Sequence, residues 1–153
     1  MKGPEDYYVI PRHKLPADVW TDPTLVVERY IQNPQNRFFR VYAAVDSIVI
    51  SEAYTDSAVK RMEGPIRRHN HFLWRDGQRI YGDTAAKLPP LLLQRAGVFL
   101  DRFGLDYGAI DIVESEDGEF YVVDLNKTPY WGDEKQAGML EHLREGFERV
   151  IEK

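Results

Sequence analysis

Two short runs rich in β-branched and aromatic residues flank the dipeptide Asp117-Gly118. The runs cover residues 107–114 and 119–126. An Asp-Gly pair tolerates the positive φ angles of a two-residue turn, so we predict that the two runs form an antiparallel hairpin. This hairpin constrains the rest of the chain, because it fixes which side chains lie opposite one another and which face must be buried.

The length of the turn sets the register of the predicted hairpin. A two-residue turn places Glu116 opposite Glu119 and Asp111 opposite Asp124. A four-residue turn would keep the same faces, whereas a three-residue turn without a bulge would separate the two aspartates. Side chains alternate along a strand, so one face is mixed and the other is apolar and must pack on a core. The mixed face carries Ala109, Asp111, Val113, Phe120, Val122, Asp124 and Asn126, and the apolar face carries Ile110, Ile112, Tyr121, Val123 and Leu125.

The mixed face brings two carboxylates and an amide together. Carboxylates that oppose each other across a hairpin repel and destabilise it. A divalent cation removes that penalty, and Mg²⁺ prefers one or two carboxylates completed by water and substrate phosphates. Asp111, Asp124 and Asn126 are therefore candidate metal ligands. The alternative is an exposed hairpin with solvated acids, but Val113 and Phe120 on the same face argue against a fully hydrated surface.

The sequence around this hairpin resembles the metal-binding end of ATP-grasp enzymes. That family shows a helix that ends in a short Gly-containing loop, a strand with an acid, and a second strand with acid-x-Asn and a nearby Pro. The matching residues here are Phe103-Gly104-Leu105, Asp111, Asp124-Leu125-Asn126 and Pro129. The family usually has Glu at the second acid, so Asp124 is one methylene shorter. The resemblance implies ATP and Mg²⁺ or Mn²⁺ as cofactors, and it covers residues 24–132.

Residues 24–31, TLVVERYI, are predicted to form a strand. In the resemblance this strand feeds the hinge between the two ATP-grasp subdomains, where backbone groups bind adenine and Glu28 matches by position. An extended chain offers the adjacent donor and acceptor that adenine needs. Val27, Glu28, Arg29 and Tyr30 are therefore candidate cofactor-binding residues. The alternative is an ordinary strand with Glu28 and Tyr30 facing solvent.

Residues 37–45 and 48–54 are predicted to form a second hairpin around Asp46-Ser47. ATP-grasp enzymes often place an Arg on the strand after the hinge, facing phosphates or substrate, and Arg40 fits that role as the candidate catalytic residue. Alternation puts Arg40 on the face of Phe38 and Tyr42. An Arg beside aromatic residues can instead lie with its stem over apolar surface.

Residues 57–82 are the most basic part of the chain. They are either a loop that contacts triphosphate or an acidic substrate, or a solvated surface, and the second interpretation is favoured. His69 and His71 lie two positions apart with no acid at ligand spacing, so no zinc site is predicted.

Two helices complete the predicted fold. One begins at Pro89-Pro90, because Pro is tolerated in a first turn, and ends at Gly104. The other runs from a cap at Asp133 to about residue 151. The apolar stripes are Leu92, Ala96, Phe99, Leu100 and Phe103 in the first helix, and Ala137, Leu140, Leu143, Phe147 and Val150 or Ile151 in the second. We therefore predict an α+β fold, a mainly antiparallel sheet with two principal helices, like the C-terminal half of an ATP-grasp fold.

Composition narrows the function further. The 153 residues include no Cys, which excludes disulfide and thiolate chemistry, and the net charge of −5 argues against a general nucleic-acid partner. The first residues lack a hydrophobic signal region, and no run reaches the length of a membrane span. We therefore expect a cytoplasmic protein without a membrane partner.

The resemblance implies a single ATP-grasp-like domain over residues 1–153. We expect an irregular segment over 1–23, the region of resemblance over 24–132 and the last helix over 133–153. The preceding subdomain of the family supplies a Lys and a Gly-rich loop, but only Gly3 precedes Gly64 here. We therefore expect the N-terminal subdomain to be missing, with a second chain as one possible source of it.

Two functions remain open at this stage. The first is a ligase that activates a small-molecule carboxylate as an acyl phosphate, which an amine or thiol then attacks. The second is a non-catalytic metal-binding, nucleotide-binding or interaction module derived from such an enzyme.

Overall fold

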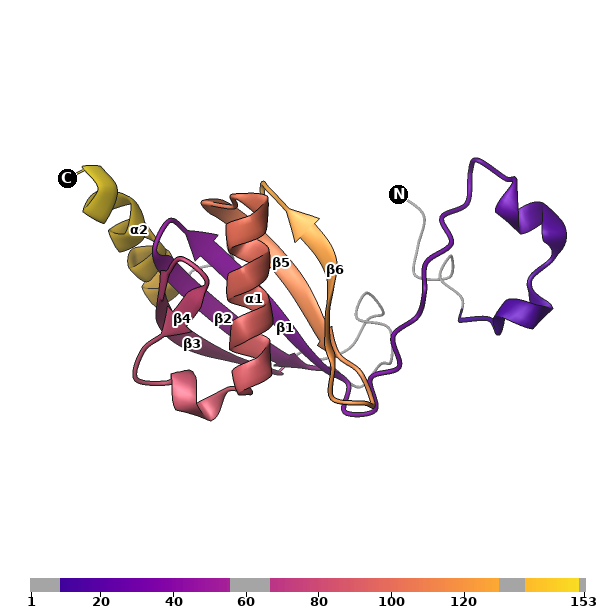
Figure 1. The fold of residues 1–153 in the computed structure, drawn as a ribbon, viewed down its shortest axis with the longest axis horizontal. Coiled ribbons are helices and arrows are strands. Elements are labelled where there is room, and N and C mark those ends of the chain that lie inside the picture. The colour runs from indigo at the N-terminus through magenta and orange to yellow at the C-terminus, as the bar shows by residue number, and fades with distance from the viewer. Residues whose placement is uncertain (1–8, 56–66, 130–136, 152–153) are drawn as a thin grey trace.

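The computed structural model describes residues 9–55, 67–129 and 137–151. The strands that it describes form one six-stranded antiparallel sheet in the order β4-β3-β2-β1-β5-β6 (Figure 1). Two helices pack on the sheet, so the α+β prediction is confirmed. The strands are β1 (Arg37–Ala44), β2 (Ser47–Tyr54), β3 (Arg67–Asp76), β4 (Arg79–Tyr81), β5 (Tyr107–Glu114) and β6 (Phe120–Asn126); the helices are α1 (Pro90–Phe103) and α2 (Ala137–Ile151); short 3₁₀ turns are η2 (Arg12–Lys14), η3 (Ala17–Trp20) and η4 (Ala85–Lys87).

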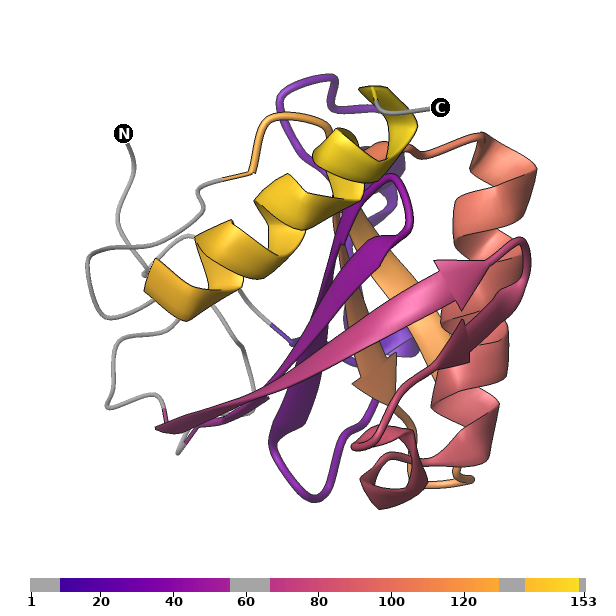
Figure 2. The same ribbon diagram turned by 90° about the vertical axis from the view of Figure 1, so that its left-hand side faces the viewer.

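The two helices lie on opposite faces of the sheet (Figure 2). α1 covers a larger apolar core that includes Phe39, Ile50 and Ile110, while α2 covers a smaller one around Tyr42 and Val49. The sheet therefore has an α1 face and an α2 face, and alternation assigns each strand residue to one of them.

Each helix approaches the sheet through a buried glycine. A Cβ added to Gly97 of α1 would lie 1.8 Å from the carbonyl oxygen of Gln78, and one added to Gly146 of α2 would lie 2.1 Å from that of Ala44. Only a residue without a side chain permits this approach of helix to backbone. The two glycines therefore fix the depth at which the helices dock.

The β5–β6 hairpin confirms the predicted pairing of Asp111 with Asp124, but by a different route. Ser115 donates to the carbonyl of Glu119 over 2.8 Å, so the turn has three residues and not two. A bulge then restores the register, because Asp111 pairs with Asp124 while Ile112 pairs with Val122 and leaves Val123 as the extra residue.

The bulge corrects the predicted faces of β6. Phe120 and Val122 pack in the α1 core and do not share the aspartate face, while Val123 is 47% exposed and not buried. Tyr121 pairs with Val113 and so lies on the aspartate face. The prediction holds on the other side of the bulge, where Leu125 packs with the α1 core.

The β1–β2 hairpin forms as predicted, with Val45 and Asp46 at the turn instead of Asp46 and Ser47. Val45 has φ of +54°, which is rare for a β-branched residue. Two contacts hold it: its N–H donates to the carbonyl of Asp106 over 2.6 Å, and its own carbonyl accepts from Arg75 Nε over 2.8 Å.

Helix α1 forms within the predicted bounds and ends at Gly104, which has φ of +57°, but Phe103 of its predicted apolar stripe is exposed. The stripe of α2 is different from the prediction, because Met139, Leu143 and Gly146 are buried while Leu140 and Phe147 are exposed. The close approach at Gly146 rotates the helix toward that line of residues. The predicted cap at Asp133 lies outside the described residues.

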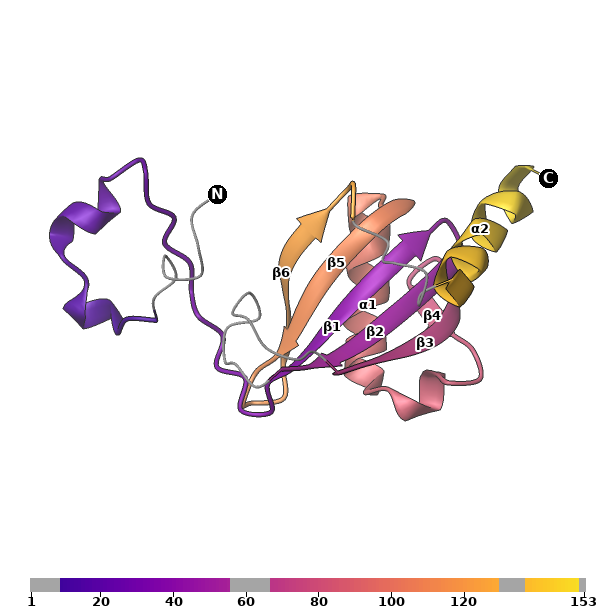
Figure 3. The same cartoon turned by 180° about the vertical axis from the view of Figure 1, so that it is seen from behind.

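The predicted strand over 24–31 is wrong, because these residues form no strand in the structure. A strand needs a partner edge, and both edges of the adjacent β1 are taken, by β2 and by β5. Residues 9–32 instead extend away from the sheet (Figure 3). Val26 is 84% exposed, and its neighbours Leu25 and Val27 are exposed as well.

Candidate functional site

The candidate site is a polar row that crosses the α2 face of the sheet. The strand pairings place Asp124 of β6 beside Asp111 of β5, Asp111 beside Arg40 of β1, Arg40 beside Ser51 of β2, and Ser51 beside Asn70 of β3. Directly paired residues point to the same face, so all five side chains project on the side of α2.

Arg40 and Asp111 form a bidentate ion pair at the centre of this row. Arg40 Nε lies 2.6 Å from Asp111 Oδ1, and Nη2 lies 2.7 Å from Oδ2. Asp111 is only 7% exposed. The hydrogen bonds to Asp111 raise the pKa of Arg40 above its usual value, although burial of the guanidinium opposes this. Two charge-assisted hydrogen bonds therefore hold the guanidinium on the carboxylate.

Asp124 and Asn126 lie on the same face of β6, two positions apart. Asp124 is exposed, and Asn126 is half-buried beside Ala109. The side-chain oxygen of Asn126 accepts a hydrogen bond from the backbone N–H of Thr128 over 2.9 Å. The structure therefore brings the three predicted metal ligands to one face, with Arg40 next to them.

The donor set fits a hard divalent cation in its chemistry. Asp111, Asp124 and Asn126 would hold the ion through two carboxylates and one amide oxygen, with phosphates and water as the remaining ligands. Among the described residues there is no group of three or more His, Cys, Asp or Glu side chains that could hold a metal ion. The described strands therefore do not surround a metal ion with protein ligands alone. The oxygen ligands that they offer suit Mg²⁺ or Mn²⁺ bound together with a phosphate group.

The predicted adenine-binding residues are not part of the sheet. Val27, Glu28, Arg29 and Tyr30 are all exposed in the extended segment before β1. The guanidinium carbon of Arg29 lies 6.0 Å from the ring centre of Tyr121, which is on the aspartate face of β6. The end of the segment therefore lies beside the hairpin end of β6 without joining the strand ladder.

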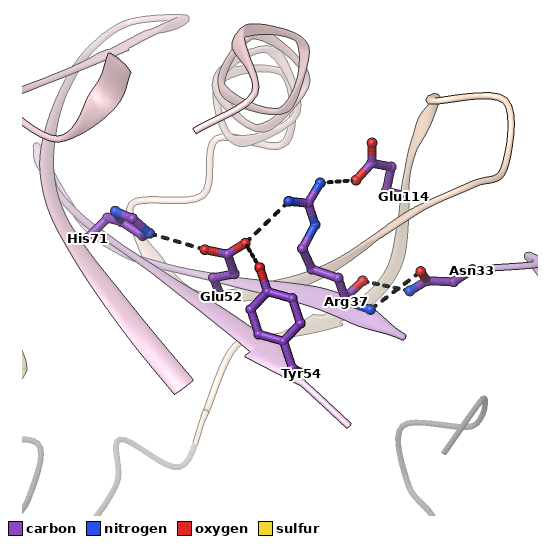
Figure 4. Close-up of polar contacts among 6 residues, drawn as sticks. All are labelled: Asn33, Arg37, Glu52, Tyr54, His71 and Glu114. Carbon is purple, nitrogen blue, oxygen red and sulfur yellow. Dashed lines mark hydrogen bonds and ion pairs between the residues drawn. The ribbon is translucent and has the colours of Figure 1, made fainter. Parts of the chain in front are cut away.

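A second polar cluster lies on the α1 face and was not predicted (Figure 4). Arg37 contacts Glu52 Oε1 over 3.4 Å and also pairs with Glu114. The hydroxyl of Tyr54 donates to Glu52 over 2.6 Å. Asn33 donates to the carbonyl of Arg37 over 2.6 Å and so links the start of β1 to the cluster.

His71 completes the α1-face cluster. Its Nε2 lies 3.5 Å from Glu52 Oε2, it is only 2% exposed, and neither ring nitrogen has a hydrogen-bond partner within the described part of the chain. Burial lowers the pKa of His71 below its usual value, against the opposing effect of Glu52. An acid does lie beside the two histidines, although their spacing in the sequence does not show it. This acid is Glu52 of the neighbouring strand β2, which pairs with His69 of β3.

No model of a known protein family matches the sequence, and no curated protein matches it either. Within the described residues, no helix has the length and apolar character needed to cross a membrane.

Solved structures of ATP-grasp ligases do match the fold. The ATP-grasp ligase PsnB complexed with minimal precursor matches at 16% identity over 73% of this chain and 30% of its own, with a TM-score of 0.39. The macrocyclase MdnC from Microcystis aeruginosa MRC, bound with the precursor peptide MdnA, matches at 16% identity over 73% of this chain and 33% of its own, with a TM-score of 0.44. PsnB complexed with a phosphomimetic variant of the minimal precursor, Mg and ADP matches at 16% identity over 72% of this chain and 33% of its own, with a TM-score of 0.41.

The chain thus spans about a third of the length of the ATP-grasp chains that it matches. The TM-scores lie below 0.5, so the likeness concerns part of the fold and carries no argument about activity. The functional argument rests on the residues of the polar row.

Proposed function

We propose that the chain provides the metal- and phosphate-binding wall of an ATP-grasp ligase-like nucleotide site. The observation that carries the proposal is the pairing of Asp111 with Asp124 on one sheet face, next to Arg40 and two residues from Asn126. Two acids that face each other across a hairpin destabilise it, a bound cation removes that penalty, and a single Arg neutralises only one of the two acids.

Each residue of the row has a role in this proposal. Asp111, Asp124 and Asn126 hold Mg²⁺ or Mn²⁺, and the ion when bound neutralises phosphate oxygens of ATP. Arg40 adds a guanidinium that can contact phosphate or the carboxylate substrate in a bidentate manner. Residues 27–30 lie outside the strands of the sheet, and in this proposal their backbone pairs with adenine.

The chemistry proposed for the completed site is activation of a carboxylate. Oxygen of the carboxylate attacks the γ-phosphorus of ATP, ADP leaves, and an amine or thiol then displaces phosphate from the acyl phosphate. Such catalysis depends on positioning and electrostatic stabilisation, so it requires no covalent attack by a side chain of the row. We propose that a second wall, on another segment or chain, is required for turnover.

The second candidate is a non-catalytic metal- or nucleotide-binding module. The observation that favours it is the bidentate pair itself, because Arg40 engages both oxygens of Asp111. A chain that kept this pair permanently closed would retain the fold without the chemistry.

Calorimetry of the chain with ATP and Mg²⁺ tests the proposal. We expect a Kd on the order of millimolar, or about 4 kcal/mol, because one wall buries only part of a nucleotide. Asp124→Asn should abolish the Mg²⁺-dependent part of the binding, whereas Asp117→Asn at the exposed tip of the same hairpin should leave it unchanged. Equal Mg²⁺ dependence in both variants would contradict the proposal, and micromolar ATP affinity would contradict the half-site.

A further inference from the structure

The ion pair of Arg40 and Asp111 has a consequence for how a cation could enter the site. Both carboxylate oxygens of Asp111 are engaged at 2.6 and 2.7 Å, and its side chain is largely buried, so solvent offers no alternative partner. Asp124, which pairs with Asp111, is exposed. With Arg40 in place, the site therefore presents the net charge of one carboxylate instead of two.

A guanidinium and a divalent cation cannot share Asp111 without strong repulsion, which partial burial makes worse. The polar row gives the guanidinium another place to lie. Ser51 is paired with Arg40 on the side away from Asp111, and Asn70 follows on the next strand. The side-chain oxygen of Asn70 is buried and has no hydrogen-bond partner among the described residues, so it can accept from a guanidinium.

We propose that Arg40 competes with the divalent cation for Asp111, so that cation binding moves the guanidinium off Asp111 toward Ser51 and Asn70. This inference rests on the proposed function, since it concerns the same metal site. The released guanidinium is then available to a phosphate group. A nucleotide phosphate then pairs with the guanidinium that Asp111 has released. Cation and nucleotide therefore bind cooperatively, and neither binds well alone.

The experiment measures Mg²⁺ affinity with and without ADP by calorimetry. In the unaltered chain, ADP should tighten Mg²⁺ binding about tenfold. Arg40→Gln should bind Mg²⁺ alone about tenfold more tightly than the unaltered chain and should lose the effect of ADP. Arg95→Gln is the matched control, because Arg95 makes an exposed pair with Glu119 and does not touch the row.

A measurement on the unaltered chain keeps the inference testable if Arg40→Gln does not fold. The Nε–H signal of Arg40 in ¹⁵N NMR should shift when Mg²⁺ and ADP are added, since its acceptor changes. One outcome would overturn the competition and preserve the proposed function. In it, Mg²⁺ binding depends on Asp124, the Arg40 signal does not shift, and Arg40→Gln binds Mg²⁺ with the affinity of the unaltered chain. No Mg²⁺ or Mn²⁺ binding to any variant, with or without ADP, would overturn both.

Discussion

Strand β1 carries two arginines three positions apart, and they serve two different ion clusters. Arg37 faces α1 and is shared between Glu52 and Glu114. Arg40 faces α2 and pairs with one acid, Asp111, through two hydrogen bonds, while Asp124 beside it is exposed. Both clusters therefore hold one Arg and two acids, and the difference lies in how the positive charge is divided.

The division of charge separates a structural cluster from a candidate binding site. On the α1 face both acids contact Arg37, and their side chains are 14% and 20% exposed. On the α2 face Asp111 forms a bidentate ion pair with Arg40, whereas Asp124 is exposed. An acid that is exposed and adjacent to another acid stabilises a bound cation, whereas a shared and shielded pair mainly ties strands together.

The largest expected effect comes from removing the shared arginine. Arg37→Met should lower the free energy of unfolding by about 2–3 kcal/mol, because it leaves two partly buried acids without a cation. Urea denaturation measures this loss. Arg95→Met, which breaks an exposed pair, should cost about 0–1 kcal/mol. A loss for Arg37→Met no larger than that of the control would show that the α1-face cluster is not structural.

The second prediction tests whether the α2 face differs in kind. Arg40→Met should lower the free energy of unfolding by about 1–2 kcal/mol in the absence of divalent cation, since Asp111 loses its bidentate ion pair with Arg40. Saturating Mg²⁺ should restore the loss by binding only the folded state. Arg37→Met keeps the row on the α2 face, so Mg²⁺ should stabilise it no more than it stabilises the unaltered chain. If Mg²⁺ stabilises both variants equally in thermal unfolding, the two clusters do not differ as proposed.

The third prediction concerns pH and the α1 face alone. Burial lowers the pKa of His71 in the folded state, so the unfolded chain binds the proton more readily. Stability should therefore be complete above about pH 6.5, the usual value for His, and fall as the pH decreases below it. The charged or titratable groups facing His71 are Glu52 from β2, His69 from β3 and Lys87 from η4.

Variants of the two histidines separate this effect from general acid unfolding. His71→Gln should flatten the pH dependence of the unfolding free energy between pH 7.5 and 5.5, as measured by urea titration. His13→Gln, which alters an exposed histidine of η2, should keep the dependence of the unaltered chain. A steeper dependence in His71→Gln would mean that Glu52 favours the protonated ring more than burial disfavours it.

Local patterns in the sequence were sufficient for the parts of the fold that depend on neighbours in the chain. The two prolines and Gly104 bracket α1 correctly, and the apolar alternation identifies β1, β2, β5 and β6. The pairing of Asp111 with Asp124 is also confirmed. The bulge at Val123 could not be predicted, because Asp117-Gly118 serves a three-residue turn as well as a two-residue one.

Features that depend on the order of strands could not be read from the sequence. Glu52, Arg37 and Glu114 meet only because β1 lies between β2 and β5. The same order closes both edges of β1, so residues 24–31 cannot pair with the strand that follows them in the chain. The acid beside the histidines was missed for this reason too, since it comes from a strand that lies earlier in the chain.

The smallest expected effect is the one that decides most about the α2 face. Asp124→Asn removes one of two opposed carboxylates, so it should raise the metal-free unfolding free energy by about 0.2–1 kcal/mol. The same change should abolish any rise in melting temperature caused by Mg²⁺ or Mn²⁺, since a neutral amide is a poor replacement for a carboxylate ligand. Asp117→Asn at the hairpin tip controls for the loss of one negative charge. If Asp124→Asn raises the metal-free unfolding free energy and also abolishes the response to Mg²⁺, Asp124 is a residue that lowers metal-free stability and binds the cation. A variant that loses metal-free stability, or that keeps the full response to Mg²⁺, would place Asp124 with the structural acids of the α1 face.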